Sequence, residues 1–533
     1  MMVFVVSFFN ILFGFGIGLI VANFLGPEEY GRFALAYATA IFVQTGFFDW
    51  IRLGAARFYS ERIRSEEPAV RATLDLGFAV IAACLAAGAS FLLLSGIKFT
   101  LSYGLIALAL GIAAANGLFD YHTALVRARF DDLLFARLLL VKNIAALALM
   151  GGGAFLFSSA KLTLIGTILS LGASVLTARA ALHDPLSNPR LARLSIARTL
   201  AAYSLPVVGA NILYLAIPLA NRSLLALVEG FSETGQFSLA YDFGVKAIHA
   251  IGSTLDIILF QLAVATQELH GPVRARRQIA RNLTILIAMI LPACTGLWLI
   301  LPSIEHLAVP PAFRGHFDAL LPLMMTGLFC LGLIQFGINP IFQIEKKTAP
   351  LILAALAACA ADPILLLLLP RDGDASRLAI AQSGAMLLAL VILVGFASRA
   401  WRRWPPPREL AVIVFGNALM SVFVLPLRDW DPGLATLTLQ VTLGTAIYAL
   451  VVLSLDIAGL RSLVIAPLRG AIGKAKTLPL FARPLAPVHE QAYPALDIDP
   501  PRYSKALKPV GRNNRWNFAR AETREDNICS GQR

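Results

Sequence analysis

Long apolar runs, separated by short stretches that carry charges or turn residues, dominate this sequence of 533 residues. A helix needs about 20 mostly apolar residues to cross the hydrocarbon core of a bilayer, and it satisfies its own backbone polar groups there. We find 14 such runs, at about 2–24, 33–53, 73–95, 99–121, 138–157, 162–178, 200–220, 236–261, 282–301, 320–338, 350–369, 378–397, 410–427 and 434–455. The sequence therefore predicts an all-α polytopic membrane protein with about 14 transmembrane helices.

Composition excludes several other classes of protein. Only 14% of the residues are charged, against about a quarter in soluble domains. The net charge of +13 does not indicate a nucleic-acid partner, because Lys and Arg are spread between apolar runs rather than gathered on one surface. Four of the five cysteines lie in apolar stretches, and no C-x-x-C or Cys/His cluster is present. We therefore expect no disulfide framework, no metal site and no cofactor.

Basic residues favour one orientation of the chain. Lys and Arg concentrate in every second connection, such as Arg137 and Lys142 after the fourth run and Arg274, Arg276 and Arg277 after the eighth. The positive-inside rule then places both termini in the cytoplasm. No phosphate-binding P-loop motif is present, so the sequence does not indicate ATP as an energy source.

A basic tail follows the last run. Residues 457–476 interleave apolar and basic side chains, a pattern typical of a helix lying on an anionic membrane surface. The remainder is rich in Pro, Arg and small residues and is predicted to be disordered. We prefer a solvated extension to a binding module for this tail.

The chain contains an internal repeat. At an offset of 204 residues, GPEEYGRFALAY at 26–37 aligns with GFSETGQFSLAY at 230–241. Each copy lies between an odd and an even run, so the repeating unit is six helices, and an even-numbered unit gives parallel repeats. We predict two six-helix lobes around a central cavity, plus two extra helices. The predicted domains are 1–199 (N-lobe), 200–397 (C-lobe), 398–455 (helices 13 and 14) and 456–533 (tail).

The repeated glycines suit a tight corner between two helices. Glu29 and Glu233 precede the second and eighth runs, where a carboxylate can face the positive end of a helix. We prefer this structural role to a substrate contact for both residues.

Ionisable residues inside the predicted spans are the default functional candidates, because burying charge in lipid is costly. Asp242, Lys246, His249, Ser253 and Asp256 form a stripe along one face of the eighth run. The offset of 204 places the second-run residues Thr45, Asp49 and Arg52 over His249, Ser253 and Asp256.

Both polar faces are therefore expected to line the central cavity. An ion pair across the lobes between Arg52 and Asp256 is conceivable. Alternatively, Asp242 with Lys246, and Asp49 with Arg52, neutralise each other within one helix.

Three further positions are weaker candidates. Asp120 lies beside Tyr121 and His122 at the end of the fourth run, where the membrane interface is an equally good location. Asp362, next to Pro363, is placed nearer the middle of the eleventh run as a lone proton site. Asn211 lies between two prolines of the seventh run, which indicate either a helix that bends or a static kink.

Two stretches resemble a known family. The segment LGPEEYGRFALAYATAIFVQTGFFDWIRLGAARFYSERIR at 25–64, and NRSLLALVEGFSETGQFSLAYDF at 221–243, are similar to the polysaccharide biosynthesis (O-antigen-type) flippases of the multidrug/oligosaccharidyl-lipid/polysaccharide superfamily. The resemblance implies two six-helix bundles around a cavity that opens alternately to either side. It also implies a bacterial inner-membrane transporter, rather than an enzyme, that moves undecaprenyl-diphosphate-linked oligosaccharide outward.

A lipid-linked diphosphate is anionic, so basic side chains are expected to meet it. The candidates for the substrate-binding cavity are Arg52, Lys246, Asp49, Arg57, Arg222 and Asn211. The candidates for coupling to protons or sodium are Asp242, His249, Asp256, Asp362 and Asp120, since a carboxylate that changes partners can bias one state. Further expected partners are the bilayer, a polysaccharide polymerase and export proteins.

Two other functions stay open. An ion-coupled multidrug exporter of the same superfamily would share the topology and the acidic residues. A membrane polysaccharide polymerase or glycosyltransferase would carry large outer loops, with acidic residues early in the first loop of a transferase. The first outer loop here is predicted to span only about residues 25–32, with Glu28 and Glu29 as its acids.

Overall fold

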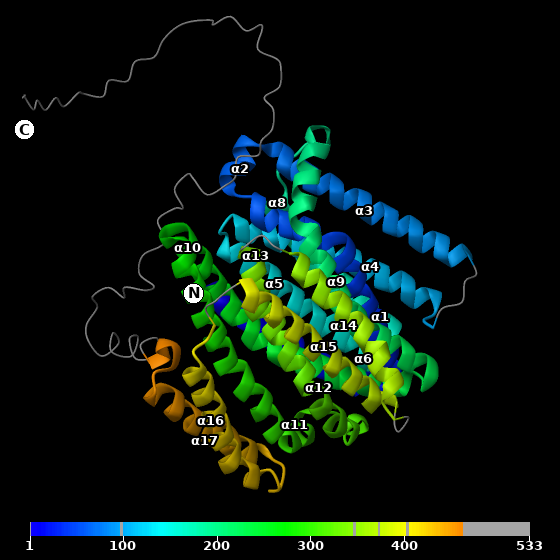
Figure 1. Cartoon of the computed structure of the whole chain (residues 1–533). Coiled ribbons are helices and arrows are strands. Elements are labelled where there is room, and N and C mark those ends of the chain that lie inside the picture. The colour runs from blue at the N-terminus through cyan, green and yellow to red at the C-terminus, as the bar shows by residue number, and fades with distance from the viewer. Residues whose placement is uncertain (1, 96–99, 345–347, 371–373, 401–403, 462–533) are drawn as a thin grey trace, which may run out of the picture. The chain divides into compact units, whose positions relative to one another are not determined.

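The computed structural model describes residues 2–95, 100–344, 348–370, 374–400 and 404–461, and all regular structure in this part of the chain is helical. Figure 1 shows the helices. Their bounds are α1 Met2–Phe58, α2 Glu61–Glu66, α3 Pro68–Ser95, α4 Tyr103–Ala128, α5 Asp132–Ala146, α6 Gly152–Phe157, α7 Ala160–Thr177, α8 Arg179–Leu182, α9 Leu194–Val228, α10 Phe231–Leu299, α11 Leu301–Ala308, α12 His316–Leu333, α13 Asn339–Ile344, α14 Ala349–Leu368, α15 Asp374–Ala400, α16 Pro407–Val424 and α17 Leu434–Ser454.

By length and composition, 13 helical segments of the described chain can cross a membrane. The first, Phe9–Phe58, has 50 residues and is therefore about 75 Å long at 1.5 Å per residue, more than twice the hydrocarbon thickness of about 30 Å. It contains the first two predicted runs, and the other segments match the remaining runs one for one. The predicted fold class, a polytopic all-α membrane protein, is confirmed.

The first corner differs from the predicted outer loop at 25–32. In α1 only Gly26 leaves helical geometry, with φ 69° and ψ 174°, and Pro27 begins the next helix. A glycine reverses the backbone course in one residue because it tolerates positive φ, and proline suits the first position of a helix. The glycine corner between the two helices is therefore confirmed, whereas the loop predicted at 25–32 is wrong, because one residue makes the corner.

The repeat appears in the backbone itself. Gly230, just before α10, has φ 91° and ψ −179°, nearly the geometry of Gly26. A Cβ on Gly31 would lie 1.9 Å from the backbone oxygen of Phe231, and a Cβ on Gly235 would lie 2.0 Å from that of Pro27. The repeat offset relates these two contacts to each other. We call this pair of contacts the glycine crossing; it holds α1 and α10 together backbone to backbone.

Apolar side chains pack within each lobe and also between the two lobes. In the N-lobe, α1 packs on α3, α4, α5 and α7; in the C-lobe, α10 packs on α12, and α9, α14 and α15 pack on one another. One buried cluster contains residues of both lobes, including Val21, Leu25, Phe237 and Leu239. The extra helices α16 and α17 pack against each other and against α10. The domain boundaries at 199, 397 and 455 stay predictions.

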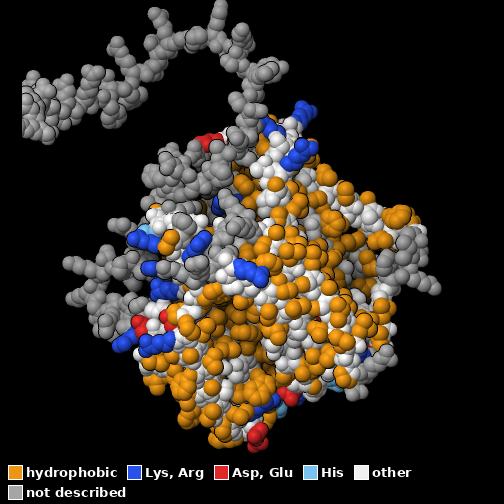
Figure 2. All heavy atoms as spheres, in the orientation of Figure 1, with side chains coloured by type: hydrophobic (Ala, Val, Ile, Leu, Met, Phe, Trp, Pro, Cys, Tyr) orange, Lys and Arg blue, Asp and Glu red, His pale blue; other side chains and the backbone are white. Residues whose placement is uncertain are grey.

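Large apolar side chains are exposed along the spans. Leu94 is 86% exposed and Leu367 is 83% exposed. Hydrophobic side chains cover most of the face in Figure 2, and Lys and Arg lie mainly toward its upper and left margins. Lipid tails can cover such apolar surfaces, so the chain is a multi-pass membrane protein. The predicted interfacial helix and disordered tail fall almost wholly at 462–533, outside the described residues.

Candidate functional site

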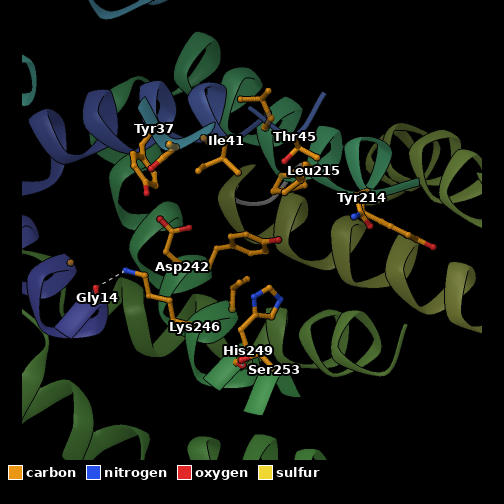
Figure 3. A pocket seen from close by; sticks show the side chains of 18 of the residues that line it. Gly14, Tyr37, Ile41, Thr45, Tyr214, Leu215, Asp242, Lys246, His249 and Ser253 are labelled. Carbon is orange, nitrogen blue, oxygen red and sulfur yellow. Dashed lines mark hydrogen bonds between the residues drawn. The ribbon is translucent and has the colours of Figure 1, made fainter. Parts of the chain in front are cut away.

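A cavity of about 870 Å³ lies between the lobes, with walls from α1, α4, α5, α7, α9, α10 and α12 and the segment that follows α12. Figure 3 shows Tyr37, Ile41 and Thr45 of α1 on one side of it and residues of α10 on the other. Its volume is near the upper end of the range for ligand sites. The ionisable side chains of its lining, tyrosines aside, are Asp49, Arg52, Lys142, Arg222, Asp242, Lys246, His249 and Asp256.

On the N-lobe wall, Asp49 and Arg52 form an ion pair within α1. Arg52 Nε lies 3.0 Å from Asp49 Oδ1, and a second nitrogen lies 3.1 Å from Oδ2. The Asp49 side chain is 10% exposed and that of Arg52 is 38% exposed. The conceived pair between Arg52 and Asp256 is not formed, because the carboxylate one turn away on the same helix takes both guanidinium contacts.

On the C-lobe wall, the partner of Asp242 comes from another helix. Arg222 of α9 donates to Asp242 of α10, and its guanidinium stacks 5.2 Å from the centre of the Tyr241 ring. The Arg222 side chain is 5% exposed. An Arg222 nitrogen also reaches across the lobes to the backbone oxygen of Ala34, at 3.5 Å. Asp242 therefore forms its direct ion pair with Arg222 of another helix, rather than with Lys246 within α10.

Lys246 instead reaches toward the opposite lobe. Its Nζ donates to the backbone oxygen of Gly14 at 3.2 Å, drawn as a dashed line in Figure 3. Gly18 leaves the space for this contact, since a Cβ there would lie 2.7 Å from Nζ. No carboxylate of the described residues lies within ion-pair distance of Lys246.

The rest of the α10 stripe has neutral partners or none. His249 Nε2 lies 2.6 Å from Oε1 of Gln335, in the segment after α12. Asp256 lines the cavity and has no hydrogen-bond or ion-pair partner within the described chain. Its carboxylate is therefore available to a ligand.

Lys142 is a cavity residue that the sequence analysis misplaced in a connection. It belongs to α5, donates to Asn10 Oδ1 at 2.8 Å, and lies 5.4 Å from the centre of the Phe119 ring. Position 142 falls inside the predicted run 138–157, so the sequence did indicate that Lys142 lies in a span and not in a connection. The amide side chains of the lining that the sequence analysis missed are Asn116, Asn143, Gln335, Asn339 and Gln343.

Of the other predicted site residues, Asn211 lines the cavity, whereas Arg57, Asp120 and Asp362 do not. Arg57 is exposed at the end of α1. Asp120 accepts a hydrogen bond from Gln44 at 2.7 Å, which ties α4 to α1.

Asp362 is not a lone site. Its side chain is buried inside the C-lobe and accepts from Asn221 at 3.2 Å, while the same Asn221 nitrogen donates to Gln382 at 3.1 Å. This polar triad joins α9, α14 and α15.

Outside the spans, the connection between the lobes is fastened to the N-lobe. Asp184 accepts from Arg64 Nε at 2.9 Å, and Ser187 donates to Asp75 at 2.8 Å. Burial works to raise the pKa of Asp184, but hydrogen bonds from the Leu186 N–H and from Arg64 outweigh it and lower that pKa. The ionised carboxylate therefore stabilises this connection.

Glu29 keeps a structural role, although with a different helix from the expected one. Its carboxylate accepts from the backbone N–H of Ala160, the first residue of α7, at 2.8 Å. It also pairs with Arg32. Across the described residues, no cluster of three or more His, Cys, Asp or Glu side chains is arranged to hold a metal ion.

No family model and no curated protein matches the sequence. Solved structures do match the fold. A lipid II flippase, MurJ, in an inward closed conformation has a TM-score of 0.62 at 15% identity and covers 87% of this chain and 99% of its own. An inward-facing MATE-family multidrug resistance transporter of the MOP superfamily has a TM-score of 0.59 at 14% identity, with 73% and 94% covered.

The MATE multidrug transporter DinF-BH has a TM-score of 0.55 at 14% identity, with 75% of this chain and 93% of its own covered. At these identities the likeness shows the fold alone. The chain has the fold of these transporters.

Proposed function

We propose that this protein is a flippase that moves a lipid-linked oligosaccharide, carried on undecaprenyl diphosphate, from the cytoplasmic to the periplasmic leaflet of a bacterial inner membrane. One observation carries the proposal. The cavity between the lobes holds two lysines, Lys142 from the N-lobe and Lys246 from the C-lobe, that have no carboxylate within ion-pair distance among the described residues.

These two cations suit a diphosphate. An ammonium in a cavity shielded from bulk water gains more from a charged acceptor than from a neutral one, and the present acceptors are an amide and a backbone carbonyl. Two paired arginines, Arg52 and Arg222, also line the cavity, and the Arg52 side chain is the more exposed of the two, at 38% against 5%. Asn116, Asn143 and Asn211 supply hydrogen bonds for sugars.

We assign ion coupling to carboxylates that can change partners. Asp256 faces the cavity unpaired within the described chain, and Asp362 shares its amide partner with Gln382. Protonation or sodium binding at such groups favours one of two conformations if the two states bind the ion unequally. Transport measured under an imposed gradient of each ion in turn distinguishes coupling to protons from coupling to sodium.

A multidrug exporter is the second candidate. The observation in its favour is the unpaired Asp256 carboxylate in the same cavity, which suits an organic cation. The fold neighbour DinF-BH is a multidrug transporter. Resistance to cationic drugs without any effect on surface glycan would identify this function.

The cellular test compares three alanine variants in the native host. Lys142→Ala and Lys246→Ala should each reduce surface polysaccharide at least tenfold while membrane levels of the protein stay unchanged. Arg57→Ala is the matched control, because it removes a basic residue of α1 that is exposed and outside the cavity. Wild-type amounts of polysaccharide in both lysine variants contradict the proposal.

A further inference from the structure

We propose that Lys246 latches the first part of α1 to α10 when the cavity is empty, and that an anionic substrate group releases this latch by binding the lysine in place of α1. This inference deepens the proposed function and rests on it for the identity of the anion. The contact between Lys246 and the Gly14 carbonyl, across the two lobes, is the observation behind it.

Two glycines of α1 make the contact with Lys246 possible. Lys246 Nζ approaches α1 beside Gly18, where a Cβ would lie only 2.7 Å from the nitrogen. The carbonyl of Gly14 is one helical turn earlier, on the same face of α1. Any larger residue at position 18 would push the ammonium away from that carbonyl.

The contact is poised for exchange. An ammonium has three donors, and within the described chain Lys246 uses one, on a neutral carbonyl. The nearest carboxylate on its own helix, Asp242, is already held by Arg222. A phosphate oxygen forms a stronger, charge-assisted bond than a carbonyl, so a diphosphate in the cavity draws Lys246 away from Gly14.

Apolar side chains and one small space surround the latch. Lys246 lies between the main cavity and a separate small space of about 10 Å³ that is walled by Phe15, Leu19, Leu239 and Phe243. Edge-to-face contact of Phe15 with Phe243, at 4.5 Å between ring centres, is the neighbouring bridge between the two helices. At this level, the hydrogen bond of Lys246 is a polar contact among apolar side chains.

The same two helices are held far more tightly at the glycine crossing. There the backbones approach so closely that no Cβ fits at Gly31 or Gly235. The crossing therefore acts as a pivot, and release of Lys246 lets the part of α1 before Gly26 swing from α10. Anion binding and helix separation are in this way one event.

The test measures the separation directly. Spin labels at Leu12 of α1 and Ile258 of α10, both exposed, report the distance between the helices by pulsed electron paramagnetic resonance. The full chain, with its native cysteines replaced, is reconstituted in nanodiscs. Undecaprenyl diphosphate is the probe, and undecaprenol, which lacks the diphosphate, is the control for the lipid chain alone.

Without any added lipid, Gly18→Ala and Lys246→Ala should both shift the distance distribution to longer values. Gly16→Ala should match the parent, because a Cβ there meets nothing within 4 Å. In the parent, undecaprenyl diphosphate should produce the same shift, and undecaprenol should not. Both latch variants should be insensitive to the diphosphate.

Two results overturn the inference in different ways. Parent-like distances in Gly18→Ala and Lys246→Ala without lipid show that Lys246 latches nothing, whatever the protein transports. Longer distances in those variants, combined with no response of the parent to the diphosphate, rule out exchange with this anion and count against the proposed substrate.

Discussion

The segment of α1 at 33–53 and the segment of α10 at 236–261 are the same element in the two halves of the repeat, yet they hold their charges differently. In α1, Arg52 pairs with Asp49 of its own helix. In α10, Asp242 pairs with Arg222 of α9, and Lys246 contacts α1. Charges of the N-lobe element stay within one helix, whereas charges of the C-lobe element connect helices.

This difference has a mechanical consequence. An ion pair within one helix moves with that helix and does not resist a change in its packing. A pair between helices must break, or carry both helices along, when they separate. We therefore expect the C-lobe charges to set the energy difference between conformations, and the N-lobe charges to serve mainly the ligand.

The largest expected effect comes from breaking the two ion pairs separately. Asp242→Asn leaves the Arg222 guanidinium, 5% exposed, without its counter-charge, which costs about 3–5 kcal/mol for a buried pair. Asp49→Asn leaves Arg52 partly exposed to the cavity, and the loss should be about 1 kcal/mol or less. Thermal unfolding in detergent compares the two. Equal losses of stability would remove the distinction between the lobes.

At the glycine crossing the two halves of the repeat are alike. We therefore expect matched substitutions there to cause equal losses of stability, unlike those at the two ion pairs. Gly31→Ala and Gly235→Ala each drive a Cβ into a backbone carbonyl, at 1.9 and 2.0 Å, and overpacking of this kind costs about 1–3 kcal/mol. The two variants should lose similar stability. Gly209→Ala, where a Cβ meets nothing within 4 Å, is the control. A large loss in one variant alone argues against a symmetric crossing.

The smallest effect concerns the connection between the lobes. The pKa of Asp184 is lowered in the folded protein, so its stabilising contribution is complete above the unfolded-state pKa of about 3.9 and is lost as the pH falls through the folded value. Asp184→Asn should cost about 1 kcal/mol at pH 7 and less near pH 3. A penalty that stays constant across this range would show that the charge is not responsible.

The spans were predictable because lipid forces long apolar helices, and 14 predicted runs correspond to 13 segments, one of which is a double span. The repeated glycines predicted a tight corner at Gly26, but not that this one residue replaces the whole loop expected at 25–32, because the surrounding sequence does not change there. Its repeat at Gly230 nevertheless signalled that the two corners share one geometry.

For the candidate site, helical periodicity placed Thr45, Asp49 and Arg52, and also His249, Ser253 and Asp256, on cavity-facing surfaces. Periodicity does not identify partners on other helices. Arg222 was found by its charge, but its pairing with Asp242 depends on how α9 packs on α10. Lys142 was missed because a basic residue near the end of a run was counted as a topology signal, although its helix turns it into the cavity.

The central claim is that the cations of this cavity carry a lipid-linked diphosphate across the bilayer. The most direct measurement is flipping of a fluorescent undecaprenyl-diphosphate-linked sugar in proteoliposomes of the purified protein, with a quencher of the outer leaflet. The account predicts that the wild type moves the lipid, and that Lys142→Ala and Lys246→Ala slow it at least tenfold. Flipping no faster than in protein-free vesicles, together with uptake of a cationic dye, would contradict the account and identify an exporter instead.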